Sequence, residues 1–144
     1  TQIYATSIDA PGVAITAGCN QAFCAAISAL AGPGDQVLLP VPWYFNHQMW
    51  MQMQGIEVGA LAFDAARGGV PSVEVAAAAM TKRTRAIVLV TPNNPTGNEY
   101  PQSLLDRAGT LLDPERPHRH HGGRQHRVRR HASGLRRARC ANQG

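Results

Sequence analysis

The residues best suited to chemistry are in the stretch TPNNPTG at positions 91–97, directly after the apolar run at 86–90. A short β-branched run that stops at a turn rich in Pro and Asn is typical of a buried strand whose carboxyl end opens into a loop, where open α/β sheets bind ligands. Pro92 and Pro95 restrict the backbone around Asn94, so its amide is expected to hold one direction and to donate to one oxygen. The alternative is that these residues only form the turn that ends the strand.

A second stretch, TAGCNQA at 16–22, has the composition of an anion-binding turn. Residues 13–16 predict a short strand, and the spacing of apolar residues after the turn predicts a helix with one apolar face at Ala22, Phe23, Ala26, Ile27 and Leu30. The N–H groups and positive dipole end of that helix would point into the turn and suit a phosphate. Glycine is common in such turns, so a purely structural role is the alternative.

Both stretches resemble segments of the class I/II aminotransferases, fold type I enzymes that use pyridoxal 5'-phosphate (PLP). The stretch TPNNPTG is similar to the Asn-Pro-Thr-Gly motif of that family, and the resemblance implies that Asn94 hydrogen-bonds the ring hydroxyl oxygen of PLP. The stretch TAGCNQA resembles the segment that holds the PLP phosphate through backbone N–H groups. The resemblance therefore implies that Gly18, Cys19 and Asn20 bind the phosphate.

The aromatic segment PWYF at 42–45 follows a predicted strand. Such aromatic residues usually belong to the core, but this segment resembles the Pro-x-aromatic segment of the same family. The resemblance implies that the ring of Tyr44, or otherwise that of Trp43, stacks on the pyridine face of PLP. A nucleophilic Cys19 is an alternative use of the first site, although the sequence shows no histidine partner for it in the part expected to be ordered.

The elements that must position these residues alternate along the chain. The patterns predict strands at 35–40, 56–63 and 86–90, and helices after residue 22, at 46–54, at 73–80 with Ser72 as cap, and from Pro101. In the helix at 46–54, Met49, Trp50 and Met53 are predicted to face the core. This alternation predicts an α/β fold, a mostly parallel sheet with helices on both faces, which the resemblance identifies as part of the fold type I large domain.

Length and composition set the limits of this interpretation. A chain of 144 residues holds one core, and it contains neither a run of eighteen apolar residues nor an amino-terminal basic and then apolar segment. A cytoplasmic protein without membrane contact is therefore expected. The three cysteines form no C-x-x-C pair, which argues against a disulfide framework.

The net charge of +5 is concentrated at one end. Residues 1–112 carry a balance of −2, and residues 113–144, rich in Arg and His, carry +7. The sequence therefore predicts a partial PLP-binding domain at 1–112 and a disordered basic tail at 113–144. The tail could collect Zn²⁺ or hold nucleic acid without specificity. The resemblance favours a third interpretation, a shift of reading frame, so neither a metal site nor a specific nucleic-acid partner is predicted.

The resemblance implies transfer of an amino group between an amino acid and a 2-oxo acid, by an enzyme that is a homodimer when full length. A PLP-dependent lyase or decarboxylase of the same fold, or a non-enzymatic basic module, are the alternatives. The family also needs a lysine that forms a Schiff base with PLP. The only lysine here, Lys82, precedes the strand at 86–90 and is not assigned that role, so no catalytic residue is predicted and the chain by itself is expected to be inactive.

Overall fold

The computed structural model describes residues 10–112, 126–127 and 139–140, and its centre is a three-stranded parallel sheet in the order β2-β1-β3. The strands are β1 (Gln36–Pro40), β2 (Glu57–Leu61) and β3 (Thr84–Ile87). The helices are α1 (Cys19–Ser28), α2 (Phe45–Met53), α3 (Val73–Ala79) and α4 (Gln102–Leu112), with short 3-10 helices at Ala10–Gly12 and Ala65–Arg67. None of the helices in these ranges is long and apolar enough to cross a membrane.

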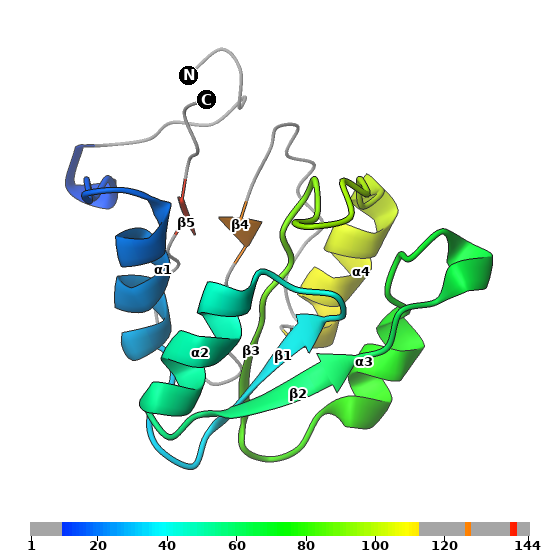
Figure 1. The fold of residues 1–144 in the computed structure, drawn as a ribbon, viewed down its shortest axis with the longest axis horizontal. Helices are drawn as coiled ribbons and strands as arrows, with labels where there is room; N and C mark the ends of the chain where they lie inside the picture. The colour runs from blue at the N-terminus through cyan, green and yellow to red at the C-terminus, as the bar shows by residue number, and fades with distance from the viewer. Residues whose placement is uncertain (1–9, 113–125, 128–138, 141–144) are drawn as a thin grey trace.

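Helices cover the sheet on both sides, as Figure 1 shows. Successive side chains of a strand point to opposite faces, so Val37 and Leu39 of β1 join a core with α1 and α2, while Leu38 joins a second core with α3 and α4. In the same way Ala86 and Ile87 of β3 belong to different cores. The predicted α/β fold with a parallel sheet and helices on both faces is confirmed.

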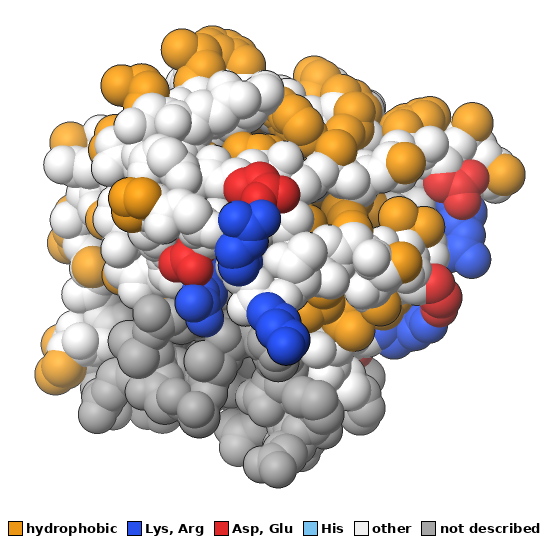
Figure 2. All heavy atoms as spheres, turned by 90° about the horizontal axis from the view of Figure 1, so that it is seen from below, with side chains coloured by type: hydrophobic (Ala, Val, Ile, Leu, Met, Phe, Trp, Pro, Cys, Tyr) orange, Lys and Arg blue, Asp and Glu red, His pale blue; other side chains and the backbone are white. Residues whose placement is uncertain are grey.

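Polar contacts fix the amino ends of the three strands, at the bottom of Figure 1. Arg85 of β3 pairs with Asp35 before β1 at 2.8 Å, and Arg83 pairs with Glu57 of β2 at 2.6 Å. Figure 2 shows this end of the molecule, where basic and acidic side chains lie side by side. These pairs are partly exposed, so each is expected to contribute little to stability, and they lie at the opposite end of the strands from their carboxyl ends.

Two predictions about local structure are wrong. Residues 13–16 form no strand: Val13 and Ile15 are exposed, and none of the described strands pairs with them. β-Branched residues favour a strand only where a neighbouring strand accepts their backbone hydrogen bonds and covers their side chains. The segment has no regular secondary structure, and bends at 17–18 lead into α1.

The buried face of α2 also differs from the prediction. Met49 and Met53 are 52% and 74% exposed, whereas Met51 is completely buried and His47 nearly so. Trp50 is partly buried against the first core. The helix carries large side chains around most of its circumference, so their spacing alone does not decide which face packs on the sheet.

The predicted basic tail falls almost entirely outside the described residues. Of the segment 113–144 the structure describes only β4 (His126–Arg127) and β5 (Arg139–Cys140), which pair antiparallel. The division at residue 112, the disorder and the frame shift therefore stay predictions.

The two methionines of α2 give a matched test of this packing. Met51→Ala is expected to lower the free energy of unfolding by about 2–5 kcal/mol, because it leaves a cavity in a buried site. Met53→Ala is expected to change it by less than about 0.5 kcal/mol, because its side chain is exposed. Urea denaturation of both variants measures the difference, and equal losses would contradict the observed orientation of α2.

Candidate functional site

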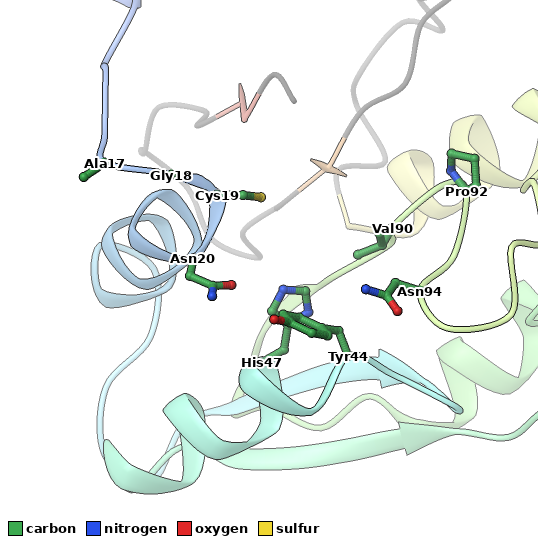
Figure 3. A pocket seen from close by; sticks show the side chains of 9 residues that line it. All are labelled: Ala17, Gly18, Cys19, Asn20, Tyr44, His47, Val90, Pro92 and Asn94. Atoms are coloured by element: carbon green, nitrogen blue, oxygen red, sulfur yellow. The ribbon is translucent and has the colours of Figure 1, made fainter. Parts of the chain in front are cut away.

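A pocket of about 440 Å³ lies between the start of α1 and the loop that follows β3. Its size is in the range of small-molecule sites. The side chains and backbone that line it come from three segments, as Figure 3 shows: Ala17, Gly18, Cys19, Asn20, Tyr44, His47, Val90, Pro92 and Asn94. All five residues predicted to bind the cofactor are among them, although their contacts with it stay a prediction.

The first wall of the pocket is the amino end of α1. Gly18 occupies the cap position with φ 107° and ψ 168°, a conformation that essentially only glycine adopts. No side chain of the described residues caps this end, and a Cβ added at Gly18 would meet no protein atom within 4 Å. The helix start therefore presents backbone rather than side chain, which suits an anion.

The turn before α1 is held by its own residues. The Thr16 hydroxyl donates to the Gly18 carbonyl oxygen at 2.9 Å, and the Ala17 N–H donates to the side-chain oxygen of Gln21 at 2.6 Å. The Ala22 N–H donates to the Gly18 carbonyl oxygen and starts the helix. These bonds, one of them to the Gln21 side chain, keep the turn in place.

The second wall is the aromatic segment between β1 and α2. Tyr44 lines the pocket, and its hydroxyl oxygen accepts a hydrogen bond from the Asn46 amide at 2.9 Å. Trp43, the other candidate for stacking, packs against the first core and donates its indole N–H to Gln48 at 2.9 Å. Of the two rings, only that of Tyr44 lines the pocket.

Four residues that line the pocket were not predicted to belong to a site, and of these only His47 has a titratable side chain; the others are Ala17, Val90 and Pro92. The ring of His47 stacks on Phe23 of α1, with centroids 4.0 Å apart, and meets the ring of Tyr44 edge-on at 5.5 Å. The signal that could have revealed His47 is its position three residues after Tyr44, which is one helical turn. His47 and Cys19 both line the pocket, and the expectation that Cys19 has no histidine partner stays a prediction.

The third wall is the loop after β3. Asn94 is exposed, and its side chain makes no hydrogen bond to any other described residue, while Figure 3 shows its amide directed toward Tyr44. The neighbouring Asn93 is only 7% exposed, and its amide donates to the Pro42 carbonyl oxygen and to the Thr96 hydroxyl. The two adjacent asparagines thus differ: one holds the loop, and the other faces the pocket.

Lys82 lies at the other end of β3. It is exposed in the turn before this strand, whereas Val90 and Asn94 follow its carboxyl end. At the rise of a strand, residues 84–90 span roughly 20 Å, more than a lysine side chain can bridge. Lys82 is not among the residues that line the pocket. Among the described residues, no group of three or more His, Cys, Asp or Glu side chains could hold a metal ion.

Comparisons with known proteins agree with one another. A family model described as aminotransferase class I and II matches residues 2–113. The chain is 34% identical over 103 residues to an aspartate aminotransferase of Streptomyces avermitilis, covering 71% of this chain and 25% of that protein. It is 34% identical over 100 residues to an aspartate/prephenate aminotransferase of Thermus thermophilus, covering 67% of this chain and 25% of that protein.

Solved structures are similar over the same region. The N-succinyldiaminopimelate aminotransferase of Mycobacterium tuberculosis matches with a TM-score of 0.71 and 27% identity, over 77% of this chain and 29% of that chain. A protein of Escherichia coli for which a methionine aminotransferase function is identified matches with a TM-score of 0.71 and 28% identity, over 77% and 29%. The chain therefore spans about a quarter of the length of these proteins.

The conformation of Gly18 can be tested without a ligand. Gly18→Ala is expected to lower the free energy of unfolding by about 1–3 kcal/mol, because alanine is strained at a φ of 107°. Gly32→Ala is the control, since an added Cβ there meets no atom within 4 Å and its φ is not in the left-handed region. Urea denaturation compares the two, and a Gly18→Ala variant as stable as Gly32→Ala would show that the turn is not strained.

Proposed function

Since the chain belongs to the class I and II aminotransferases, we propose that it is part of an enzyme that uses PLP to transfer an amino group from an amino acid to a 2-oxo acid. The observation that carries the proposal is the convergence of three separate segments on one pocket. Each segment supplies the kind of group that one part of PLP needs. For the full-length protein we further propose a homodimer in the cytoplasm, on the family resemblance alone.

The described residues fit the cofactor. A phosphate needs N–H donors without a side chain in the way, and the start of α1 has glycine at its cap and no side-chain cap among the described residues. A flat heteroaromatic ring needs an aromatic face, which Tyr44 supplies. The ring oxygen needs a donor, and the amide of Asn94 has no other partner in the described part of the chain.

In this proposal, PLP when bound supplies an electron-withdrawing ring that stabilises negative charge on the α-carbon of the amino acid. The backbone of Gly18, Cys19 and Asn20 binds the phosphate and fixes one end of the cofactor. Tyr44 covers one face of the ring and excludes water from it. Asn94 donates to the ring oxygen and favours its ionised form, because a hydrogen bond to the charged form stabilises that form.

The chain binds the cofactor in this proposal but supplies no lysine to react with it. Lys82 is the only lysine of the chain, and it lies in the turn at the amino end of β3, away from the pocket. Binding of PLP to this chain is therefore proposed to be non-covalent.

Removal of the Asn94 amide tests the site. Asn94→Ala is expected to weaken PLP binding by about 1.5–3 kcal/mol, or roughly 10- to 150-fold in Kd, since a hydrogen bond to a charged oxygen is lost. Asn94→Asp, which has the same shape but no donor, is expected to bind at least as weakly. In a spectrophotometric titration of the bound cofactor, the pKa of its ring hydroxyl should rise in both variants.

The control for this test is stability. Asn94 is exposed, so the free energy of unfolding should change by less than about 0.5 kcal/mol. If the wild-type chain does not bind PLP, the proposed function is contradicted. If all three proteins give the same Kd and the same ring pKa, the assignment of Asn94 is wrong, and Asn94 is only a turn residue.

Lys82→Ala provides a second test. Because Lys82 lies at the far end of β3, the variant is expected to bind PLP with the wild-type Kd. Equilibrium dialysis measures the affinity, and the absorbance spectrum of the bound cofactor should also be unchanged. A cofactor band that withstands dialysis in the wild type and disappears in Lys82→Ala would mean that this lysine is the attachment site.

A further inference from the structure

Asn93 makes contacts that join two of the three segments around the pocket. Its side-chain N–H groups donate to the Pro42 carbonyl oxygen at 3.2 Å and to the Thr96 hydroxyl oxygen at 3.0 Å. Pro42 belongs to the aromatic segment, 51 residues earlier in the chain, whereas Thr96 belongs to the same loop as Asn93. One amide therefore binds the aromatic segment after β1 and the loop after β3 at the same time.

The backbone of Asn93 organises the loop itself. Its N–H donates to the Asn98 carbonyl oxygen at 2.7 Å, and its carbonyl oxygen accepts from the Gly97 N–H at 2.7 Å. With 7% of its surface exposed, Asn93 is one of the few buried polar residues of the described chain. A buried amide without partners would be costly, so these bonds stabilise one conformation of the loop against others.

The hydrogen bond between Asn93 and Pro42 has a pocket-lining residue close to each of its two ends. Asn94 is the next residue in the loop, and Tyr44 lies two residues after Pro42. A contact between Asn93 and Pro42 therefore fixes how far the Asn94 amide lies from the Tyr44 ring. It adds to the pairing of β1 with β3 and to the packing of Trp43 and Val90 on the first core, which hold the two segments further from the pocket-facing groups.

We infer that Asn93 is a positioning residue of the cofactor site, which sets the Asn94 amide and the Tyr44 ring at a fixed relative position; this inference rests on the proposed function. Asn93 itself does not line the pocket. Its effect on a ligand is exerted through Asn94 and Tyr44, so it is distinct from the residues assigned to the cofactor above.

The first experiment needs no ligand. In a Trp50→Phe background, Trp43 is the only tryptophan, and quenching of its fluorescence by acrylamide reports how firmly the aromatic segment is held. The indole N–H of Trp50 is buried and has no hydrogen-bond partner in the described part of the chain, so phenylalanine removes no bond. Asn93→Ala is expected to raise the quenching constant of Trp43, because the hydrogen bond to Pro42 is lost.

Two further variants separate this contact from general loosening of the loop. Asn98→Ala removes a bond of the same loop, from the Asn98 amide to the Gly68 carbonyl oxygen at 2.6 Å, and is expected to leave the quenching constant unchanged. Asn93→Asp keeps the size of the side chain, and at pH 8 its carboxylate can accept from Thr96 but cannot donate to Pro42. It is expected to raise the quenching constant, and it carries the test should Asn93→Ala fail to fold.

The second experiment uses PLP and a double-mutant cycle. Asn93→Ala is expected to raise the Kd for PLP about tenfold and to raise the pKa of the bound ring hydroxyl. In the Asn94→Ala background, the same substitution should no longer change that pKa, since the group through which Asn93 acts on it is already absent. A merely structural role would give equal effects in both backgrounds.

The outcomes distinguish this inference from the proposed function. An unchanged quenching constant in folded Asn93→Ala and Asn93→Asp overturns the inference, whatever the protein binds. Equal shifts of the ring pKa in both backgrounds overturn it as well. A wild-type chain that does not bind PLP overturns the proposed function, and the quenching of Trp43 then still decides whether Asn93 joins the two segments.

Discussion

The parallel pairing of β1 with both neighbours is the constraint on which the rest of the structure depends. Every residue of β1 is buried, and the strand lies between β2 and β3 with helices on both faces. In a parallel sheet the carboxyl ends of the strands lie at one edge. The segments that leave β1 and β3 therefore emerge next to each other, and the aromatic segment and the loop with two asparagines share one pocket.

The three walls of the pocket are joined by a short series of contacts. Phe23 of α1 stacks on His47 of α2, and His47 meets the ring of Tyr44 edge-on. Pro42, two residues before Tyr44, accepts the hydrogen bond from Asn93. Apolar ring contacts thus join the helix to the aromatic segment, and a polar bond joins that segment to the loop. Because interiors are closely packed, such contacts fix positions well enough for a site to be formed in advance.

Much of the fold could be predicted from the sequence, and the exceptions have physical reasons. The strands predicted at 35–40 and 56–63 correspond to β1 and β2, whereas the strand predicted at 86–90 begins earlier, since β3 spans Thr84–Ile87. The buried face of α1 followed from its spacing. The strand expected at 13–16 is absent, since exposed β-branched residues do not form a strand without a neighbour. The prediction of the buried face of α2 was wrong because Met and aromatic residues occupy both sides of this helix. Only packing against the sheet determines that Met51 is buried while Met49 and Met53 are exposed.

For the site, the sequence by itself determined the kinds of residues and the strand and helix ends on which they lie: glycine at the start of α1, aromatics after β1 and asparagines after β3. Local chemistry could not decide which of two adjacent rings or amides faces the pocket. In the tertiary structure Trp43 packs against the core and Tyr44 lines the pocket. Asn93 is buried, whereas Asn94 is exposed and lines the pocket. His47 also lines the pocket. Neighbouring side chains point in different directions, and their assignment depends on backbone hydrogen bonds and packing between segments far apart in the chain, which no local pattern encodes.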